Sequence, residues 1–402
     1  MRIAIGFCLW LAASVAISHA ADDLGRLEPP RAMPDDAWDR PFHRSEGWTG
    51  ADAMYSVDLR NGKVLWLFAD TWIGPIKDGR HAEGSRLVNN TAAMHAISPD
   101  GAPPAPDAVT FTWGKADAEG HPTAWIVPAD KDTWYWVADG IVTNDAGDKP
   151  KLHVFLWKMR RAKGDGVFGF ALAGGAIAVI DNPGDDWSKW QVTQHDLPHT
   201  VPDLPDNEKP VAGSPPHRSI NWGSELLSVS EDGREWLYVY GYRSGKPGNE
   251  LLIARALADR LIDFDAWEFR TKDRWSKSLQ DATEQASLVP TEFSITPVEI
   301  HGKKNWLLVQ SETMLGPHVM VRTSPSPLGP WSKPIAIFDV PDLKRNKKYF
   351  SYAAKGHPEL SKPGELLITY VVNSFDFGAM IHDPEIYRPR FIRLPLDHLT
   401  AE

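Results

Sequence analysis

Two aspartates, Asp52 and Asp70, flank a pair of strand-like segments joined by a tight Asn-Gly turn. An antiparallel hairpin would bring both carboxyl groups to the same end. Paired carboxyls beside aromatic residues suit the hydrolysis of a sugar bond, in which one acid protonates the leaving oxygen and another acts as base or nucleophile. Asp139 and Glu292 stand at comparable strand positions further along the chain. We take these four acids as candidate catalytic residues.

Short apolar strands that each follow turn residues recur along the chain, whereas helical periodicity is nearly absent. Such regular repetition predicts an all-β fold and, more specifically, a five-bladed β-propeller spanning residues 47–396. A pair of β-sandwich domains is the alternative architecture. The repeated strands are residues 65–68, 152–156, 236–240, 306–309 and 366–370.

The two ends of the chain differ from this repeating part. Residues 1–20 combine a basic start, an apolar run and small residues near Ala20, which is typical of a signal peptide cleaved before Ala21. An uncleaved anchor is the alternative, although the apolar run is short for a membrane span. We expect residues 21–46 to form an extended lead-in and residues 397–402 a C-terminal tail.

Composition narrows the cellular location and the partners. The single cysteine, Cys8, lies within the predicted signal peptide, so we expect a mature chain without disulfides that is exported to the periplasm or beyond the cell. A net charge of −10 among 402 residues argues against nucleic acid or an anionic membrane as partner. No segment after the signal approaches membrane length. The 18 tryptophans suit a protein that stacks sugar rings on aromatic faces.

In a propeller the first strand of each blade lines a central channel, so polar residues of those strands should converge. Unpaired charges buried in a plain core would be costly, which makes a functional channel the better explanation. We expect no metal or cofactor in catalysis. The candidate substrate-binding residues in and around these strands are Trp48, Trp72, Arg86, Asn90, Trp136, Asn221, Trp222, Glu225, Arg243 and His357.

The hairpin also carries a resemblance. Gly50-Ala51-Asp52-x-x-Tyr55-Ser56-Val57, the segment 65–72 that ends in Asp70-Thr71-Trp72, Asn89-Asn90 and Lys355-x-His357-Pro358 resemble a family of exported bacterial five-bladed propellers. That family consists largely of domains of unknown function and is similar to arabinanase, arabinofuranosidase and endo-D-arabinanase glycoside hydrolases. Ala69 replaces a glycine that is usual in the family pattern. The resemblance implies a polysaccharide or oligosaccharide partner.

His357 has several interpretations. Related propellers place a histidine over a central structural ion, which is one role that the resemblance implies for this residue. We favour a hydrogen bond from His357 to a substrate hydroxyl or to a neighbouring carboxylate.

Three functions compete at this point. The first is a secreted glycoside hydrolase that acts on an arabinan-like or other cell-wall or plant glycan through carboxylate acid/base catalysis. The second is a carbohydrate-binding propeller without catalysis, in which tryptophans stack on the sugar. The third is a structural or protein-interaction propeller.

Overall fold

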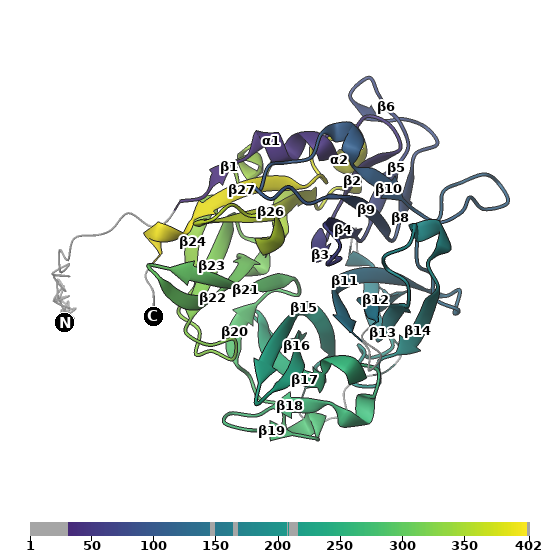
Figure 1. Ribbon diagram of the computed structural model, residues 1–402. Coiled ribbons are helices and arrows are strands. Elements are labelled where there is room, and N and C mark those ends of the chain that lie inside the picture. Colours follow the sequence, from purple (N-terminus) through teal and green to yellow (C-terminus); the bar gives the residue numbers. More distant parts are fainter. Residues whose placement is uncertain (1–30, 145–148, 164–167, 207, 209–215, 400–402) are drawn as a thin grey trace, which may run out of the picture.

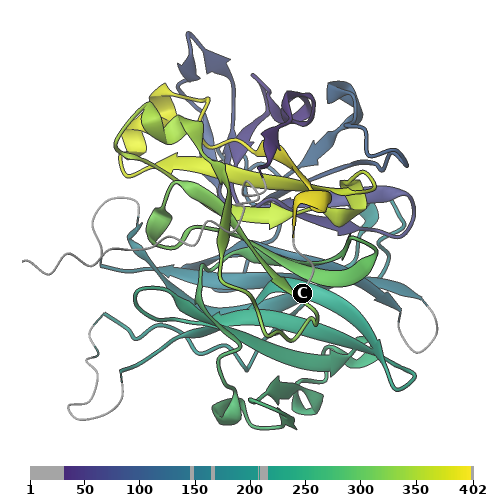
Figure 2. The ribbon, with the colours of Figure 1, turned by 90° about the vertical axis from the view of Figure 1, so that its left-hand side faces the viewer.

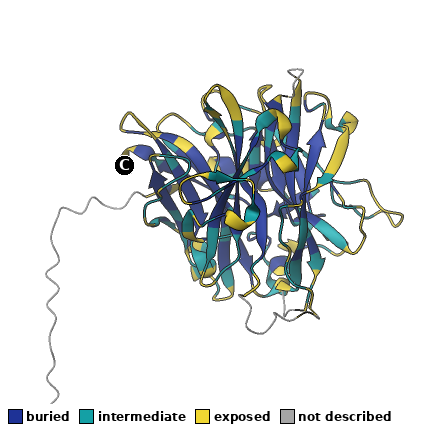
Figure 3. Cartoon of the chain, turned by 90° about the horizontal axis from the view of Figure 1, so that it is seen from below, coloured by how far each residue is buried: buried dark blue, intermediate teal, exposed yellow. Residues whose placement is uncertain are grey.

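β-Strands dominate the chain, and the two α-helices found among the described residues are short. The computed structural model describes residues 31–144, 149–163, 168–206, 208 and 216–399. Buried residues concentrate in the strands, and exposed residues concentrate in the loops (Figure 3). The all-β prediction is confirmed, whereas the predicted signal peptide lies outside the described residues. The helices are α1 (Asp36–Asp39) and α2 (Phe377–His382).

Five sheets of four or more antiparallel strands follow one another along the chain and surround a common centre (Figure 1). The first contains β3 (Tyr55–Asp58), β4 (Lys63–Phe68), β9 (Thr91–Ala96) and β10 (Thr110–Thr112). The second contains β11 (Thr133–Asn144), β12 (Pro150–Arg161), β13 (Phe170–Ile180) and β14 (Val192–Asp196). The third contains β15 (Ile220–Glu231), β16 (Arg234–Arg243), β17 (Asn249–Leu257), β18 (Glu268–Arg270), β19 (Trp275–Ser276) and β20 (Ala286–Val289).

The fourth and fifth sheets complete the ring of sheets. The fourth contains β21 (Phe293–Ile300), β22 (Lys303–Ser311), β23 (His318–Ser324) and β24 (Ile335–Asp339). The fifth contains β25 (Tyr349–Gly356), β26 (Glu365–Ser374), β27 (Arg390–Pro395) and β1 (Met33–Pro34). In the first four of these sheets the strand nearest the centre is the one that comes first in the sequence: β3, β11, β15 and β21 (Figure 1). In the fifth sheet, β25 is the edge strand opposite β1.

The second strand of each sheet is packed on both faces, which explains its unbroken apolar sequence. In β4, the five residues from Val64 to Phe68 are all fully buried, at 0% exposure. A strand that is covered on both faces favours continuous apolar residues over an alternating pattern. The apolar runs that marked the repeats in the sequence are therefore the interior strands of the sheets.

The segment expected to be an extended lead-in instead supplies an outer strand and a capped helix. β1 pairs with β27, so the N-terminal part of the chain completes the last sheet, with purple β1 beside yellow β27 in Figures 1 and 2. The Asp35 side chain caps α1 by accepting from the backbone N–H groups of Ala37 and Trp38. Trp38 and Phe42 are buried and anchor the segment. Short elements of this kind have no periodicity that sequence could reveal.

Two small sheets extend the region around the first sheet. β2 (Trp48–Ala51), β5 (Thr71–Ile73) and β8 (Arg86–Val88) form one of them, and β6 (Ile76–Lys77) and β7 (Arg80–His81) form the other. β2 and β5 continue the direction of the β3–β4 hairpin beyond a break in the pairing. The expected hairpin is thus formed, but as two paired stretches.

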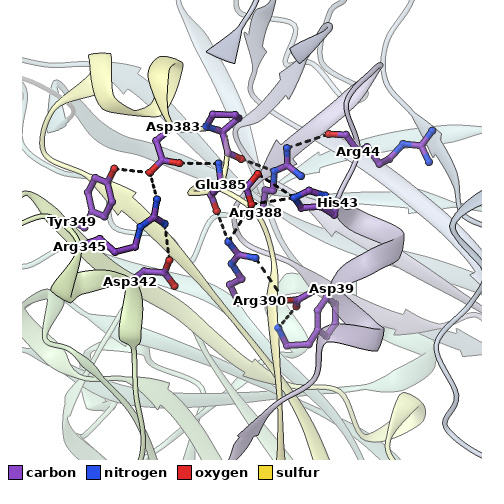
Figure 4. A network of polar contacts seen from close by, with 12 residues as sticks. Asp39, His43, Arg44, Asp342, Arg345, Tyr349, Asp383, Glu385, Arg388 and Arg390 are labelled. Carbon is purple, nitrogen blue, oxygen red and sulfur yellow. Dashed lines mark hydrogen bonds and ion pairs between the residues drawn. The ribbon is translucent and has the colours of Figure 1, made fainter. Parts of the chain in front are cut away.

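A network of ion pairs holds the loop between α2 and β27 against its surroundings (Figure 4). Asp383 accepts hydrogen bonds from Arg345 at 2.6 Å and from the Tyr349 hydroxyl at 2.8 Å. Glu385 lies 3.1 Å from His43 of the N-terminal segment. These contacts fix the loop that carries Tyr387, a residue that reaches the centre of the molecule.

No helix within the described ranges is both long and apolar enough to cross a membrane.

Candidate functional site

The break in the hairpin places Asp52 and Asp70 opposite each other. Ala53 and Met54 adopt positive φ angles of 68° and 54°, which interrupt the strand directly after Asp52. The Asp52 N–H still donates to the Asp70 carbonyl at 3.2 Å, and the Ala69 N–H donates to the Asp52 carbonyl at the same distance. Both side chains therefore leave the backbone at one end of the hairpin, where the sequence predicts them.

Two tyrosines hold one oxygen of Asp52 and leave the other oxygen without a partner. Asp52 Oδ2 accepts from the Tyr352 hydroxyl at 2.6 Å and from the Tyr387 hydroxyl at 2.8 Å. Asp52 Oδ1 is buried and has no hydrogen-bond partner among the described residues. Burial, followed by the charges of Asp70 and Glu292, raises the pKa of Asp52 well above its usual range. Burial and the neighbouring negative charges thus both stabilise the protonated form of Asp52 relative to the charged form.

Asp70 lies in a different environment. Its Oδ1 accepts from the Trp136 indole N–H at 2.8 Å and from the Asn89 amide at 3.1 Å. Burial raises the pKa of Asp70 to about 6, and the two hydrogen bonds, which favour the charged form, oppose this rise. Burial thus raises the pKa of both neighbouring carboxyls, while their hydrogen-bond donors differ: two tyrosine hydroxyls at Asp52, and an indole and an amide at Asp70.

The third carboxyl, Glu292, is paired with a buried lysine. Lys355 Nζ donates to Glu292 Oε1 at 2.8 Å and to the carbonyls of Ala53 at 2.5 Å and Ala353 at 3.2 Å. Burial lowers the pKa of Lys355, while the charge of Glu292 and its hydrogen bond oppose this decrease. Lys355 thereby links the first, fourth and fifth sheets at the centre of the molecule.

Asp52, Asp70 and Glu292 line a hollow that opens to the surface, here called the Asp52 hollow. It has two lobes, of about 350 Å³ and about 510 Å³, which share Asp52, Trp136 and Asn373. Pockets of this size can enclose a small-molecule group. The structure therefore brings three of the four candidate catalytic acids to one open site.

The fourth candidate, Asp139, lies elsewhere, and we correct its assignment. It lines a separate hollow, here called the Asp139 hollow, at the opposite end of the inner strands. Its two oxygens accept from the backbone N–H groups of Gly140 and Leu226, each at 2.8 Å. Burial raises the pKa of Asp139 to about 8, against these two hydrogen bonds. Asp139 therefore joins the second sheet to the third.

A β-bulge explains why Asp139 does not face the same end as Asp52, although the two residues have comparable strand positions in the sequence. The pairing of β11 with β12 shifts its register between Val137 and Gly140, so Asp139 lies within the bulge. A bulge adds one residue to a strand and turns the following side chains to new directions. Asp52 precedes the corresponding break in its own strand and faces the other end.

Glu225 and His357 also line the Asp139 hollow instead of the Asp52 hollow. The His357 ring nitrogens form hydrogen bonds with the hydroxyls of Ser56 at 2.6 Å and Thr369 at 2.7 Å. Burial, and after it the charge of Lys355, lowers the pKa of His357 to about 3, so its ring is neutral. Both nitrogens thus bond hydroxyl groups of the chain itself, whereas we expected a substrate hydroxyl or a neighbouring carboxylate.

Three of the four tryptophans expected to stack on sugar are core residues. Trp48 is 1% exposed and stacks on Phe111 with ring centres 4.8 Å apart. Trp72 stacks on His81 at 4.5 Å. Trp222 is fully buried. Only Trp136 faces the Asp52 hollow.

Two of the remaining predicted binding residues, both amides, are structural. Asn90 is buried, and its amide donates to the carbonyls of Ile126 and Tyr135, while its oxygen accepts from the Ile126 N–H. Asn221 is buried and accepts from the backbone N–H of Trp222 at 3.1 Å. Both side chains hold backbone in place.

The two arginines predicted to bind substrate lie outside both hollows. Arg86 is exposed and donates to His121 at 2.9 Å. Arg243 pairs with Glu250 at 2.6 Å. Neither guanidinium group reaches the carboxyls of the Asp52 hollow.

Sequence reasoning missed the tyrosines that contact Asp52. Tyr387 lies in the loop after α2, which has no repeating pattern, and its backbone carbonyl would lie only 2.4 Å from a Cβ atom at Gly50. Glycine at position 50 therefore allows the loop to approach β2 closely. This glycine, two residues before Asp52, was the one sequence signal of a close neighbour.

Comparison with solved structures finds chains of similar fold. A crystal structure from Bacteroides ovatus, of a protein provisionally named a hydrolase, has a TM-score of 0.67 and 18% identity over 90% of each chain. The catalytic domain of a Coprinopsis cinerea GH62 alpha-L-arabinofuranosidase has a TM-score of 0.41 at 10% identity, covering 91% of this chain and 95% of its own. The alpha-L-arabinofuranosidase PaAbf62A of Podospora anserina, in complex with cellotriose, has a TM-score of 0.42 at 10% identity, with coverages of 92% and 96%.

TM-scores as low as the last two do not bear on the activity of this chain. No curated protein matches it. A family model does match residues 35–395, nearly the whole described chain. The chain therefore belongs to the family described as Domain of unknown function (DUF5005).

Proposed function

We propose that this protein is a glycoside hydrolase whose reaction takes place in the Asp52 hollow. The observation that carries the proposal is geometric: Asp52 and Asp70 lie opposite each other at one open hollow, and one buried oxygen of Asp52 has no partner among the described residues. Asp52 has a pKa well above its usual range, and Asp70 has a pKa of about 6. Such a pair provides a proton donor and a proton acceptor in one open site.

The proposed roles follow from the contacts. Asp52 gives its proton to the leaving glycosidic oxygen as the bond from that oxygen to the anomeric carbon breaks. Asp70 takes a proton from the water whose oxygen forms the new bond to the anomeric carbon. The sugar thus gains a hydroxyl group, and the leaving oxygen gains a proton. The charge of Glu292, like the larger effect of Asp70, raises the pKa of Asp52. Glu292 therefore helps to keep this proton donor protonated.

We also propose the finer architecture and the location. Each of the five sheets would be one blade of a five-bladed propeller, with β1 completing the blade formed by β25 to β27. The pattern of residues 1–20 supports export to the periplasm or the extracellular space. The substrate would then be a polysaccharide met outside the cytoplasm, with an arabinan-like or other cell-wall or plant glycan as the first candidate.

A polysaccharide screen tests the proposal. The protein without residues 1–20 is incubated with arabinans, galactans, xylans and mycobacterial arabinogalactan, and released reducing ends are measured. We expect hydrolysis of at least one polymer that is lost in Asp52→Asn. Saturable binding without cleavage would overturn the enzyme and favour a carbohydrate-binding propeller.

A further inference from the structure

The two lobes of the Asp52 hollow are separated by chain segments that approach from different sheets. Residues 168–170, before β13, enter from the second sheet, and residues 373–377, after β26, enter from the fifth. Phe168 lines the first lobe, whereas Phe170 lines the second. These segments lie at the mouth of the hollow, between the lobes. The residues that line both lobes, Asp52, Trp136 and Asn373, form the floor that the lobes share.

Three phenylalanine rings make the division. Phe168 lies 6.2 Å from Phe350 and 6.0 Å from Phe375, and Phe350 lies 4.6 Å from Phe375, measured between ring centres. We call Phe168, Phe350 and Phe375 the aromatic bridge. Phe350 also contacts the ring of Tyr352 at 5.6 Å, and the Tyr352 hydroxyl donates to Asp52. The bridge is thus connected directly to the candidate acid.

Two rings of the bridge are unusually exposed for phenylalanine, whereas the third, Phe350, is buried. Phe168 is 45% exposed and Phe375 is 50% exposed, and Phe377, which lines the second lobe, is 44% exposed. Exposed apolar side chains that gather at a hollow mark a ligand-binding surface. These three are the exposed phenylalanines of the described chain: Phe168 and Phe377 each line a lobe, and Phe375 contacts Phe168.

Polar groups differ between the lobes. Glu292 and Glu312 line the first lobe together with Phe168 and Phe350 of the bridge. Arg161 lines the second, with its guanidinium 5.8 Å from the centre of the Trp134 ring. Each lobe therefore combines aromatic faces with hydrogen-bonding groups, as a sugar ring with C–H faces and hydroxyl edges requires.

We propose that a saccharide chain passes beneath the aromatic bridge, with one sugar in each lobe and the linking oxygen beside Asp52. This inference rests on the proposed hydrolase function and adds its mode of action. Because both lobes lead away from the shared floor, the chain continues in both directions and internal bonds are cleaved. The bridge excludes side branches from the two sugars that it covers.

The first test examines the products of the wild-type protein, which avoids any effect of substitution on folding. Debranched linear α-1,5-arabinan and linear β-1,3-galactan are digested, and the first products are sized by mass spectrometry. We expect oligosaccharides of several lengths from the earliest time points. Release of monosaccharide alone would overturn internal cleavage while leaving the hydrolase function intact.

The second test removes the bridge. Phe168→Ala/Phe375→Ala should lower kcat/KM on the cleaved polymer by about tenfold, because stacking contacts on two sugars are lost. The loss on the matching 4-nitrophenyl monoglycoside should be smaller, since that compound occupies one lobe. Val192→Ala removes an exposed apolar side chain from β14 and serves as the matched control. Equal losses on polymer and monoglycoside would contradict the bridge.

A binding experiment separates the two proposals if no polymer is cleaved. Calorimetry with α-1,5-arabinohexaose and with β-1,3-galactohexaose then compares the wild type with the double variant. Binding by the wild type that weakens about tenfold in the double variant supports the bridge although hydrolysis fails. Binding that the double variant retains, or no binding of either compound by the wild type, overturns the bridge.

Discussion

The two ends of the inner strands contain similar acidic residues with different hydrogen-bond partners. The Asp52 hollow contains Asp52, Asp70 and Glu292, and the Asp139 hollow contains Asp139, Glu225 and Glu359. Burial is the largest cause that raises the pKa of each acid at the second end, to about 7 for Glu359 and about 8 for Asp139. Residue type and proton affinity alone therefore do not distinguish the two ends.

Hydrogen-bond partners distinguish Asp139 from Asp52. Asp139 uses both oxygens to accept from backbone N–H groups, one of them in the neighbouring sheet. Asp52 uses one oxygen for two tyrosine hydroxyls and leaves the other without a partner. A buried oxygen without a partner costs free energy, and such a cost is expected where a ligand completes the site. Asp139 therefore holds two sheets together, whereas Asp52 keeps one oxygen available to a ligand.

Asp52→Asn should have the largest effect on activity. The amide keeps the shape of the side chain but has no acidic proton to give, so kcat should fall by about 10²–10⁴-fold. Turnover is measured on the polymer that the parent cleaves, with the melting temperature as a check on folding. If this variant keeps the turnover of the parent, Asp52 is not a catalytic residue, and the contrast between Asp52 and Asp139 does not reflect function.

Lys355→Met should affect both ends at once, because Lys355 bonds Glu292 and also lines the Asp139 hollow. Removing one partner of a buried ion pair leaves the other charge uncompensated, so the free energy of unfolding should fall by about 3 kcal/mol. Guanidinium denaturation measures this change. Lys347→Met, at an exposed position, is the matched control. An unchanged midpoint for Lys355→Met would show that this lysine does not hold the centre together.

Asp139→Asn should reduce stability and leave chemistry intact. Asparagine has one accepting oxygen, so its amide group would face one of the two backbone N–H donors, and the free energy of unfolding should fall by about 1–3 kcal/mol. The kcat of the folded variant should stay within about twofold of the parent, since only structural contacts change. Lost turnover at parental stability would instead make Asp139 part of the active site.

The sequence predicted what local rules determine. The Asn61-Gly62 pair located the turn of the β3–β4 hairpin and so the end at which Asp52 and Asp70 meet, although the loop contains Arg60 as well, with positive φ at Arg60 and Gly62. Apolar runs identified interior strands because those strands are covered on both faces. The all-β class followed from these two signals.

The rest depended on contacts between distant segments. The bulge that redirects Asp139 forms where β11 meets other sheets, and no residue pattern marks it. Whether Trp48 or Phe168 is exposed depends on which segments cover each ring, and here the tryptophan is buried and the phenylalanine exposed. Tyr387 reaches Asp52 from more than 300 residues away along the chain, at a separation of 335. Aromatic type alone therefore did not predict which rings are exposed.

Trp136→Phe should give the smallest effect, seen as a change in pH dependence. The variant keeps an aromatic ring in the Asp52 hollow but lacks the N–H that donates to Asp70, a bond that favours the charged carboxylate. The pKa of Asp70 should therefore rise from about 6. Because Asp70 acts in its ionised form, activity is lost as pH falls through this pKa, and the acidic limb of kcat/KM should move to higher pH by roughly one unit.

The control for this shift is Trp134→Phe, which changes a neighbouring indole of the same hollow that has no hydrogen bond to Asp70 among the described contacts. Its acidic limb should remain in place even if its substrate affinity changes, because the environment of the Asp70 carboxylate is preserved. A shift to lower pH in Trp136→Phe would mean that the indole stabilises the neutral acid. Equal shifts in both variants would trace the limb to the general polarity of the hollow and not to the bond between Trp136 and Asp70.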